Sequence, residues 1–385
     1  MKRFPAPWKF GGIVLLFIIG IVFRVLALPA VSTDMQWGLF QWYDFLEVHG
    51  AQGLGIQFAT YSPPYLYLLW FATLTSGFLP KLLAIKLISI IADIINMFLI
   101  YRIVRLKYQA GLMPLLASAL FWSMPTVILN SSLWGEADSI YTTLLLACLY
   151  FLMSDQPLLG VCFFGAAFTV KAQAFFIFPV LILLALKKRI AWYYFLVIPL
   201  IYGILCLPAI LLGQSWFDVF TIYLFQSSVY HDVSRNAPNL YIFMNSFPYV
   251  ITTITGLILA AVLTLGWIWN NMRAKLDINR NTIVLMGLVS VGLVPFLLPK
   301  MHDRYFYPAD VFSLLAAFYM PELWFVPILY QVISTLAYMV FLFNVPVVAT
   351  EIAAVLNTLT VIFLVWKQSR TLIPTSQPLS KESLA

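Results

Sequence analysis

The sequence predicts an all-α protein, a polytopic helical bundle embedded in a membrane. Of its 385 residues, 62% are hydrophobic and only 10% are charged, whereas soluble domains carry about 25% charged residues. The mean hydropathy is +0.93, and apolar segments bounded by Pro, Gly or charged residues recur along the chain. At about 20 residues for each spanning helix, this length fits one membrane bundle with short loops.

The apolar segments predict about twelve transmembrane helices. They cover residues 10–28, 82–104, 112–129, 137–153, 158–170, 173–186, 190–212, 247–269, 281–298, 306–320, 323–342 and 347–366. We expect one membrane domain over residues 1–370 and a polar cytoplasmic tail over 371–385. The first segment could be a signal peptide, but Arg24 interrupts it and a bundle follows, which favours a retained helix.

Basic residues predict the orientation of the bundle. If residues 65–79 dip into the membrane without crossing it, 15 of the 22 Lys and Arg residues face the cytoplasm, as the positive-inside rule requires. These are Lys2, Arg3, Lys9, Arg102, Arg105, Lys107, Lys187, Lys188, Arg189, Arg273, Lys275, Arg280, Lys367, Arg370 and Lys381. The net charge of +7 therefore reflects topology, and we expect no nucleic-acid partner.

The first loop on the opposite, outer side contains a candidate catalytic carboxylate and a predicted helix. Residues 35–49 place four apolar side chains on one helical face: Met35, Leu39, Trp42 and Leu46. This pattern is typical of a helix that lies in the membrane interface. Asp34 precedes it, so the carboxylate has two interpretations: an N-cap of this helix or a functional group. The loop ends with Tyr61 and a Ser-Pro-Pro sequence.

Two further outer segments carry ionisable groups. In the segment 130–139, Asp138 or Ser139 could cap the next helix, which leaves Trp134 and Glu136 unexplained. Glu136 and Asp138 could also bind a divalent cation, although no histidine spacing supports a metal site. Lys171, next to Gln173, lies at a helix end, where a lone lysine usually extends to the membrane surface.

The densest polar cluster follows residue 298. Lys300, His302 and Arg304 lie together on the side that the positive-inside rule should deplete, which favours a bound anion. Within the predicted spans, Asp93 is a costly buried carboxylate. It could serve function, or it could join helices through Asn96 or a neighbouring hydroxyl.

These segments, in this order, resemble the GT-C superfamily of polyprenyl-phosphate-sugar-dependent glycosyltransferases. The closest similarity is to the mannosyltransferase-like branch related to the second mannose transferase of GPI-anchor synthesis and its bacterial relatives. It covers residues 30–310 through Thr33-Asp34-Met35, Tyr61-Ser62-Pro63-Pro64-Tyr65-Leu66-Tyr67, Asn130-Ser131-Ser132-Leu133-Trp134-Gly135-Glu136-Ala137-Asp138-Ser139, Lys171-Ala172-Gln173, Asn236-Ala237-Pro238-Asn239-Leu240 and His302-Asp303-Arg304-Tyr305. Glu136 stands where Gln is more usual, and Asp303 where Glu is expected, so the substrate class is open.

The resemblance implies inverting transfer of a hexose, mannose or glucose, from a polyprenyl-phosphate sugar to a hydroxyl of a lipid or glycan. It implies that Asp34 is the catalytic base. We expect the donor phosphate to bind the basic residues Lys171, Lys300, His302 and Arg304. We expect substrate to contact Tyr61, Trp134, Glu136, Asp138, Gln173, Asn236 and Asn239.

No cofactor is expected, apart from the cation considered at Glu136 and Asp138. The implied location is a bacterial plasma membrane with the site outside, or the endoplasmic reticulum with a luminal site. A transporter or flippase of a lipid-linked sugar is the alternative function. That alternative predicts inverted repeats and broken helices at the midplane, and Asp93 is the one feature in its favour. A structural subunit with a degenerate site is a third class.

Overall fold

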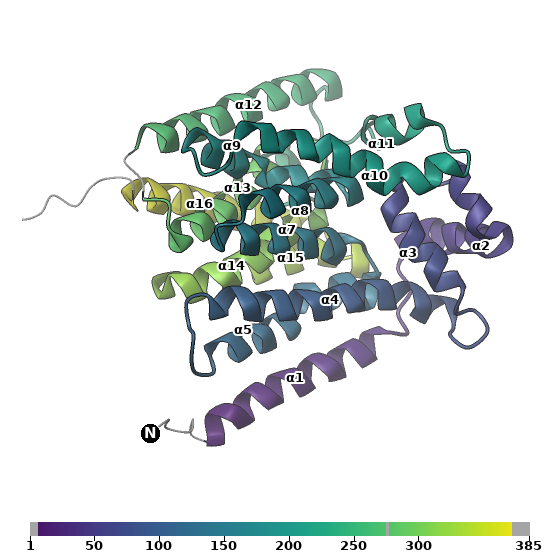
Figure 1. The fold of residues 1–385 in the computed structure, drawn as a ribbon, viewed down its shortest axis with the longest axis horizontal. Helices are drawn as coiled ribbons and strands as arrows, with labels where there is room; N and C mark the ends of the chain where they lie inside the picture. The colour runs from purple at the N-terminus through teal and green to yellow at the C-terminus, as the bar shows by residue number, and fades with distance from the viewer. Residues whose placement is uncertain (1–6, 275–276, 372–385) are drawn as a thin grey trace, which may run out of the picture.

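The computed structural model describes residues 7–274 and 277–371. Within them, most helices run along one axis, which is horizontal in Figure 1. The α-helices are α1 (Pro7–Ala27), α2 (Phe40–His49), α3 (Pro63–Thr73), α4 (Lys81–Arg105), α5 (Met113–Trp122), α6 (Pro125–Ile128), α7 (Asp138–Met153), α8 (Pro157–Val170), α9 (Phe178–Leu186), α10 (Val197–Leu211), α11 (Trp216–Val229), α12 (Tyr249–Arg273), α13 (Arg280–Leu297), α14 (Tyr307–Tyr319), α15 (Val326–Phe343) and α16 (Val348–Thr371).

Short segments connect these helices. Two parallel strands of two residues each, β1 (Ser234–Arg235) and β2 (Met301–His302), form the β-sheet of the described residues. π-Helical turns occur at Met35–Leu39 and Leu129–Trp134. Short 3₁₀ helices occur at Gly50–Gly55, Ala172–Ile177, Trp192–Leu196, Leu240–Met244, Asp303–Phe306 and Pro321–Leu323.

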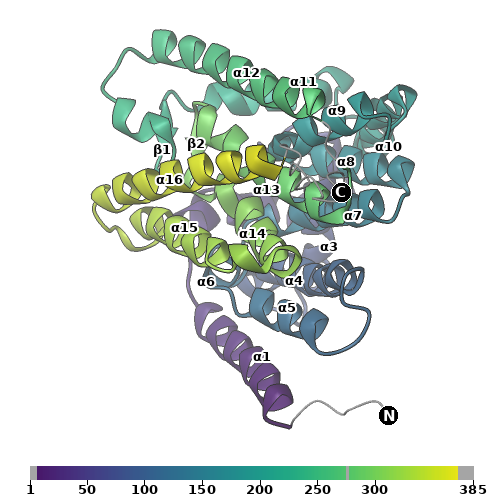
Figure 2. The same ribbon diagram turned by 90° about the vertical axis from the view of Figure 1, so that its left-hand side faces the viewer.

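The bundle has a buried centre and an apolar outside. In α13, every residue from Ile283 to Leu297 is buried, and Figure 2 shows α13 and α14 enclosed by other helices. The peripheral helices α1, α12 and α16 instead expose large apolar side chains such as Leu15, Leu257 and Leu359. So much exposed apolar surface requires lipid around it. The chain is therefore a multi-pass membrane protein with an all-α fold.

Seven helices of the described chain are long and apolar enough to span a membrane, and the bent α5–α6 pair would make eight. They are Phe10–Ala27, Lys81–Arg105, Trp192–Leu211, Tyr249–Arg273, Arg280–Leu297, Pro321–Phe343 and Val348–Arg370. The 50° bend of the pair follows from Pro125, which cannot continue the preceding helix. The expected spans at 137–153, 158–170 and 173–186 are shorter apolar helices. The number twelve thus stays a prediction, and the expected tail falls, from residue 372 onward, outside the described residues.

The first loop forms the predicted helix, with a different environment for its apolar face. The π-helical turn continues directly into α2, and Met35, Leu39, Tyr43 and Leu46 are buried in the protein core. This face packs against protein, whereas Trp37 and Val48 on the same segment are exposed. The location of the segment in the membrane interface stays a prediction. The segment after Ser62 forms α3, whose 11 residues extend about 16 Å, too short to cross about 30 Å of hydrocarbon.

Basic side chains hold together the loops at one end of the bundle, which we call the basic end. Lys107 donates to the carbonyl of Tyr319 at 2.5 Å, Lys187 to that of Ala274 at 2.6 Å, and Arg280 to that of Leu106 at 2.8 Å. Helices α2, α3 and α11 lie together at the opposite end, on the right in Figure 1. The described members of the predicted cytoplasmic clusters therefore share one end.

Candidate functional site

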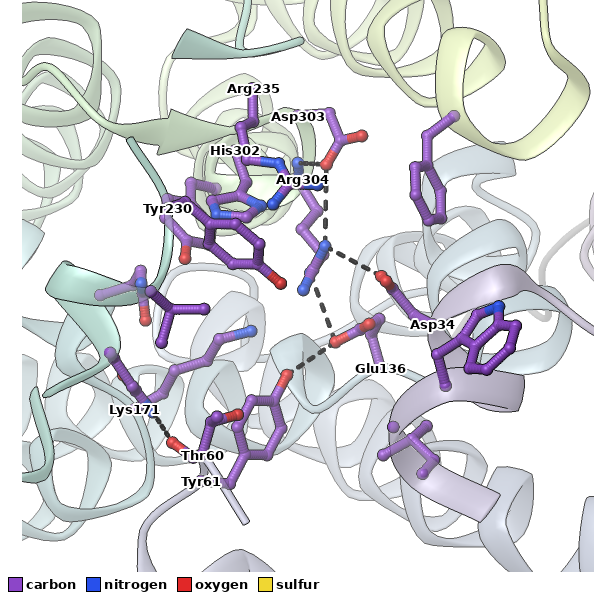
Figure 3. Close-up of a pocket in the computed structure, with 18 of the residues that line it drawn as sticks. Asp34, Thr60, Tyr61, Glu136, Lys171, Tyr230, Arg235, His302, Asp303 and Arg304 are labelled. Atoms are coloured by element: carbon purple, nitrogen blue, oxygen red, sulfur yellow. Dashed lines mark hydrogen bonds and ion pairs between the residues drawn. The ribbon is translucent and has the colours of Figure 1, made fainter. Parts of the chain in front are cut away.

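A cavity of about 350 Å³ lies at the end of the bundle formed by α2, α3 and α11. Segments from seven regions of the chain surround it, and eight of the twelve predicted site residues line it. These eight are Asp34, Tyr61, Glu136, Lys171, Gln173, Asn236, His302 and Arg304. Figure 3 shows Asp34 across the cavity from Lys171 and Tyr230, with the guanidinium of Arg304 between them.

Local structure leaves the Asp34 carboxylate free to face this cavity. The hydroxyl of Ser32 accepts a hydrogen bond from the backbone N–H of Met35 at 3.2 Å, while the Asp34 side chain makes no capping bond. The N-cap interpretation of Asp34 is therefore wrong, because Ser32 performs that role. Asp34 Oδ2 instead accepts from Trp134 Nε1 at 3.0 Å and lies 3.4 Å from Arg304 Nη1.

Buried groups hold Asp34 and Trp134 in place. The indole of Trp134 is fully buried and stacks on Phe341, with ring centroids 5.0 Å apart. Lys86, also buried, donates to the carbonyls of Ala27, Leu28 and Ala30 at 3.1, 2.9 and 2.7 Å. These carbonyls end α1 and would otherwise lack partners. Lys86 thus fixes the turn that leads into Asp34.

Arg304 is the electrostatic centre of the site. Its guanidinium lies within 4 Å of four carboxylates: 3.3 Å from Glu136, 3.4 Å from Asp34, 3.6 Å from Asp138 and 3.8 Å from Asp303. Burial lowers the pKa of Arg304, but the carboxylates, Glu136 first, outweigh burial and raise that pKa well above its ordinary value. Arg304 is therefore a permanent cation that offsets the charge of several buried acids.

The candidate cation site at Glu136 and Asp138 already contains this guanidinium. Among the residues that the structure describes, no three His, Cys, Asp or Glu side chains gather to hold a metal ion. Burial raises the pKa of Glu136, with Arg304 acting against that shift. The hydroxyl of Tyr61 donates to Glu136 Oε2 at 2.9 Å. This carboxyl is thus integrated into a protein network.

Lys171 also forms a buried ion pair. Its ammonium lies 2.6 Å from Asp138 Oδ1, and the two side chains are 6% and 0% exposed. Asn130 donates to the other oxygen of Asp138 at 3.0 Å. Lys171 therefore does not extend to the membrane surface, and Asp138 does not line the cavity but orients the lysine that does.

Strand pairing brings His302 to the cavity. The two short strands that pair were not predicted from the sequence. β1 pairs with β2 in the register Arg235↔His302, so two loops about 70 residues apart meet. Burial, followed by the charges of Arg304, Arg235 and Lys171, lowers the pKa of His302 well below its ordinary value. At neutral pH His302 is therefore uncharged and can contribute a hydrogen bond but no positive charge.

Three other predicted residues are placed outside the cavity lining. Lys300 donates to the carbonyl of Ser227 and lies over the ring of Tyr249. Asn239 is buried, accepts from the N–H of Tyr241 at 3.1 Å and donates to the carbonyl of Leu298 at 3.0 Å. Trp134 does not line the cavity but donates a hydrogen bond to Asp34, which does. These contacts give Lys300 and Asn239 structural roles in the loops around the site.

The cavity also contains residues that the sequence analysis did not assign to the site. Arg235 lines it beside Tyr230, with the guanidinium 3.7 Å from the ring centroid. Its acidic neighbour is Asp232 at 3.8 Å, and that carboxylate is more than half exposed. The position of Arg235 directly before Asn236 was the signal available in the sequence. Trp37 and Phe341 line the cavity as well.

Asp93 has a structural partner that neither sequence interpretation named. Its Oδ2 lies 2.8 Å from Arg24 Nη1, and both side chains are buried. Arg24 also donates to the hydroxyls of Ser131 and Ser132 at 2.7 and 3.0 Å. The hydroxyl of Ser139 donates to Asp93, so the interpretation that Asp93 joins helices through a neighbouring hydroxyl is confirmed. Asn96 donates to Ser139 and not to Asp93. The Arg24–Asp93 pair joins α1 and α4 to the segment that carries Trp134 and Glu136.

The protonation of Asp303 predicts how stability depends on pH. Burial raises its pKa from an ordinary value of 3.8 to about 7. A carboxyl whose pKa is higher in the folded protein stabilises it fully below about pH 4, and this contribution is lost as pH rises through about 7. Neutral His302 contributes the opposite trend, because its pKa is lowered in the folded protein. The expected result is therefore a difference: the unfolding temperature of Asp303→Asn, relative to that of the wild type, should rise from pH 5 to pH 8. Asp232→Asn, at an exposed carboxylate, is the control, and an unchanged slope in Asp303→Asn would contradict this assignment.

Comparisons of the chain with models of protein families and with curated proteins find no match.

Proposed function

We propose that this protein is a membrane glycosyltransferase that moves a hexose from a polyprenyl-phosphate sugar to an acceptor hydroxyl. The observation that carries the proposal is the arrangement of one cavity, in which the Asp34 carboxylate faces Lys171 and Arg235 from separate segments. A base on one side and cations on the other match the two charged species of this reaction, the proton released by the acceptor and the anionic phosphate that leaves. The base accepts the proton of the acceptor, and the cations stabilise the leaving phosphate.

The chemical step is a single displacement. The acceptor oxygen attacks the anomeric carbon, the bond from that carbon to the phosphate oxygen breaks, and the hydroxyl proton passes to Asp34. Both protein contacts of Asp34 use Oδ2, which leaves Oδ1 without a protein partner among the described residues. The departing polyprenyl phosphate is already an anion, so it requires positive charge and not a general acid.

We assign the donor phosphate to Lys171 and Arg235, with His302 as a neutral hydrogen-bond donor. Arg304 is shared by four carboxylates, so a phosphate would have to displace one of them. We therefore give Arg304 the role of organising Asp34 and Glu136. Among the described residues, Lys171 pairs with Asp138 alone, and its ammonium has three N–H donors, so two remain for a phosphate. A second, apolar groove of about 460 Å³ between α3, α4 and α7 offers space of the kind that an isoprenoid chain requires.

Donor preference tests the proposal directly. We expect purified protein in lipid nanodiscs to consume polyprenyl-phosphate mannose or glucose and to leave nucleotide sugars untouched. Turnover should persist in EDTA, because Lys171 and Arg235 supply the positive charge that the leaving phosphate requires. The measurement is release of polyprenyl phosphate, with heat-inactivated protein as the control. Transfer from a nucleotide sugar in the absence of any lipid intermediate would contradict the proposal.

The side of the membrane is a separate prediction. We propose that the basic end is cytoplasmic and that the cavity opens on the other side, outside a bacterial cell or in the lumen of the endoplasmic reticulum. Single cysteines at Gln109 and Asp232, in a chain lacking Cys148, Cys162 and Cys206, should react with a membrane-impermeant reagent from opposite sides. Labelling of both from the same side would refute this topology.

The alternative, a transporter or flippase, predicts broken helices, and the bent α5–α6 pair is one. The other feature that favoured it, Asp93, has a structural explanation. Asp93 is paired with Arg24 at 2.8 Å inside the bundle, which accounts for a carboxylate within a span without an ion pathway. The ionisable groups of the cavity also lie at the end of the bundle formed by α2, α3 and α11, and not at its midplane. We therefore advance no transport function.

A further inference from the structure

One side of the cavity presents aromatic surface that the donor chemistry does not use. Trp37, Gly38 and Trp42 line the cavity on the segment that begins at Asp34, whereas Lys171 and Arg235 belong to other segments. Phe341 adds a ring beside Asp34, since it stacks on Trp134 and Trp134 donates to Asp34. The base therefore lies among aromatic side chains, away from the phosphate-binding residues.

Trp37 is exposed although its apolar neighbours are buried. Its side chain is 73% exposed, while Met35 and Leu39 are 0% and 4% exposed. Trp37 lies on the π-helical turn that begins directly after Asp34, and both residues line the cavity. The sequence thus places a large flat apolar surface beside the proposed base and leaves it uncovered within the described protein.

Gly38 keeps the space next to the indole of Trp42 open. A Cβ atom at this position would have the Trp42 ring at 3.9 Å as its nearest neighbour, an ordinary contact. Backbone packing therefore does not demand glycine here. Its effect is to leave the cavity wall beside the Trp42 ring, which we call the floor, free of any side chain.

We propose that the acceptor is a carbohydrate, whose ring lies on Trp37 over Gly38 and presents a hydroxyl to Asp34. This inference rests on the proposed function and names its acceptor class. A pyranose face carries C–H bonds of partial positive charge, which pack well against the negative face of an aromatic ring. Its hydroxyls donate to carboxylate oxygens. An acyl glycerol or a seryl peptide has no comparable flat C–H face.

The transfer step is unchanged by this assignment. A hydroxyl oxygen of the acceptor sugar forms the new bond to the anomeric carbon, its proton goes to Asp34, and polyprenyl phosphate leaves. Because Trp37 touches the acceptor and not the donor, its loss should affect transfer without affecting hydrolysis of the donor by water. That difference separates acceptor binding from a general effect on the fold.

The experiment compares Trp37→Ala with Trp216→Ala, a matched control at a tryptophan that is 66% exposed on α11 and does not line the cavity. The probes are p-nitrophenyl glycosides of mannose, glucose and galactose, a seryl tripeptide and dioctanoyl glycerol, with polyprenyl-phosphate mannose and glucose as donors. We expect transfer to a glycoside, with its KM raised about tenfold or more in Trp37→Ala, as the loss of one aromatic contact of about 1.4 kcal/mol predicts. The glycoside KM of Trp216→Ala should equal that of the wild type. The rate of donor hydrolysis by water should be the same in Trp37→Ala as in the wild type.

Gly38→Val is the second variant, because it fills the floor without touching the base. We expect it to raise the glycoside KM while donor hydrolysis continues. Glycoside KM values unaltered in both variants would overturn the subsite alone. Preferred transfer to the peptide or to the glycerol would also overturn it. Absence of any donor consumption, with or without acceptor, would overturn the proposed function and the subsite with it.

Discussion

Replacement of Asp34 by Asn is expected to slow sugar transfer by about 100- to 10,000-fold, the usual contribution of a general base. An amide at this position can still accept the hydrogen bond from Trp134 Nε1, which is 3.0 Å from Oδ2 in the protein, but it cannot accept the acceptor proton. Because Lys171 and Arg235 are unchanged, donor KM should change little. The measurement is single-turnover transfer from polyprenyl-phosphate mannose or glucose, together with donor KM.

Asp44→Asn is the matched control for this change. Asp44 lies on the same helical segment, is 53% exposed, and pairs with Lys81 at 2.7 Å outside the cavity. An exposed pair contributes at most about 1 kcal/mol, so this variant should retain stability and turnover. Normal turnover in Asp34→Asn, with Asp44→Asn equally active, would show that another group is the base, and Glu136 would be the next candidate.

The fold class follows from the sequence because membrane-spanning helices consist of long runs of apolar residues. The positive-inside rule also grouped loops correctly: Lys107, Lys187 and Arg280, far apart along the chain, bond to neighbouring loops at one end. The number of spans did not follow, since helices such as α8 and α9 are too short to decide by length alone. The environment of the apolar face of α2 did not follow either, because such a stripe suits a lipid interface and a protein core equally well.

Residues that line the cavity were predictable where they stand in a compact motif, as Asp34 and His302 do. Roles that depend on long-range pairing were not. Nothing in the sequence shows that Arg304 reaches four carboxylates, that Arg24 pairs with Asp93 across 69 positions, or that Lys86 satisfies the end of α1. These contacts exist only after α1, α4 and α7 have packed together. The spacing of charged residues along the chain therefore does not predict these contacts.

Arg304→Ala is expected to cause the largest loss of stability among these substitutions. It would leave the buried carboxylates of Glu136, Asp138 and Asp303 facing one another without their shared cation. Removal of one partner from a buried ion pair typically costs about 3–5 kcal/mol. We therefore expect a strongly lowered unfolding temperature, and loss of activity that follows loss of folded protein. The measurement is thermal unfolding of ligand-free protein in detergent.

Arg235→Ala separates this role from phosphate binding. Arg235 has only a partly exposed carboxylate within 4 Å, at 3.8 Å, so its loss should leave the unfolding temperature nearly unchanged. Donor KM should rise, because a charged hydrogen bond to phosphate is lost, while binding of a glycoside acceptor should not change. The two arginines thus predict opposite results in the two assays. If Arg304→Ala instead folded normally and only weakened donor binding, Arg304 would be the phosphate ligand that the sequence alone suggested, and its four carboxylates would owe their position to the backbone and to Lys171.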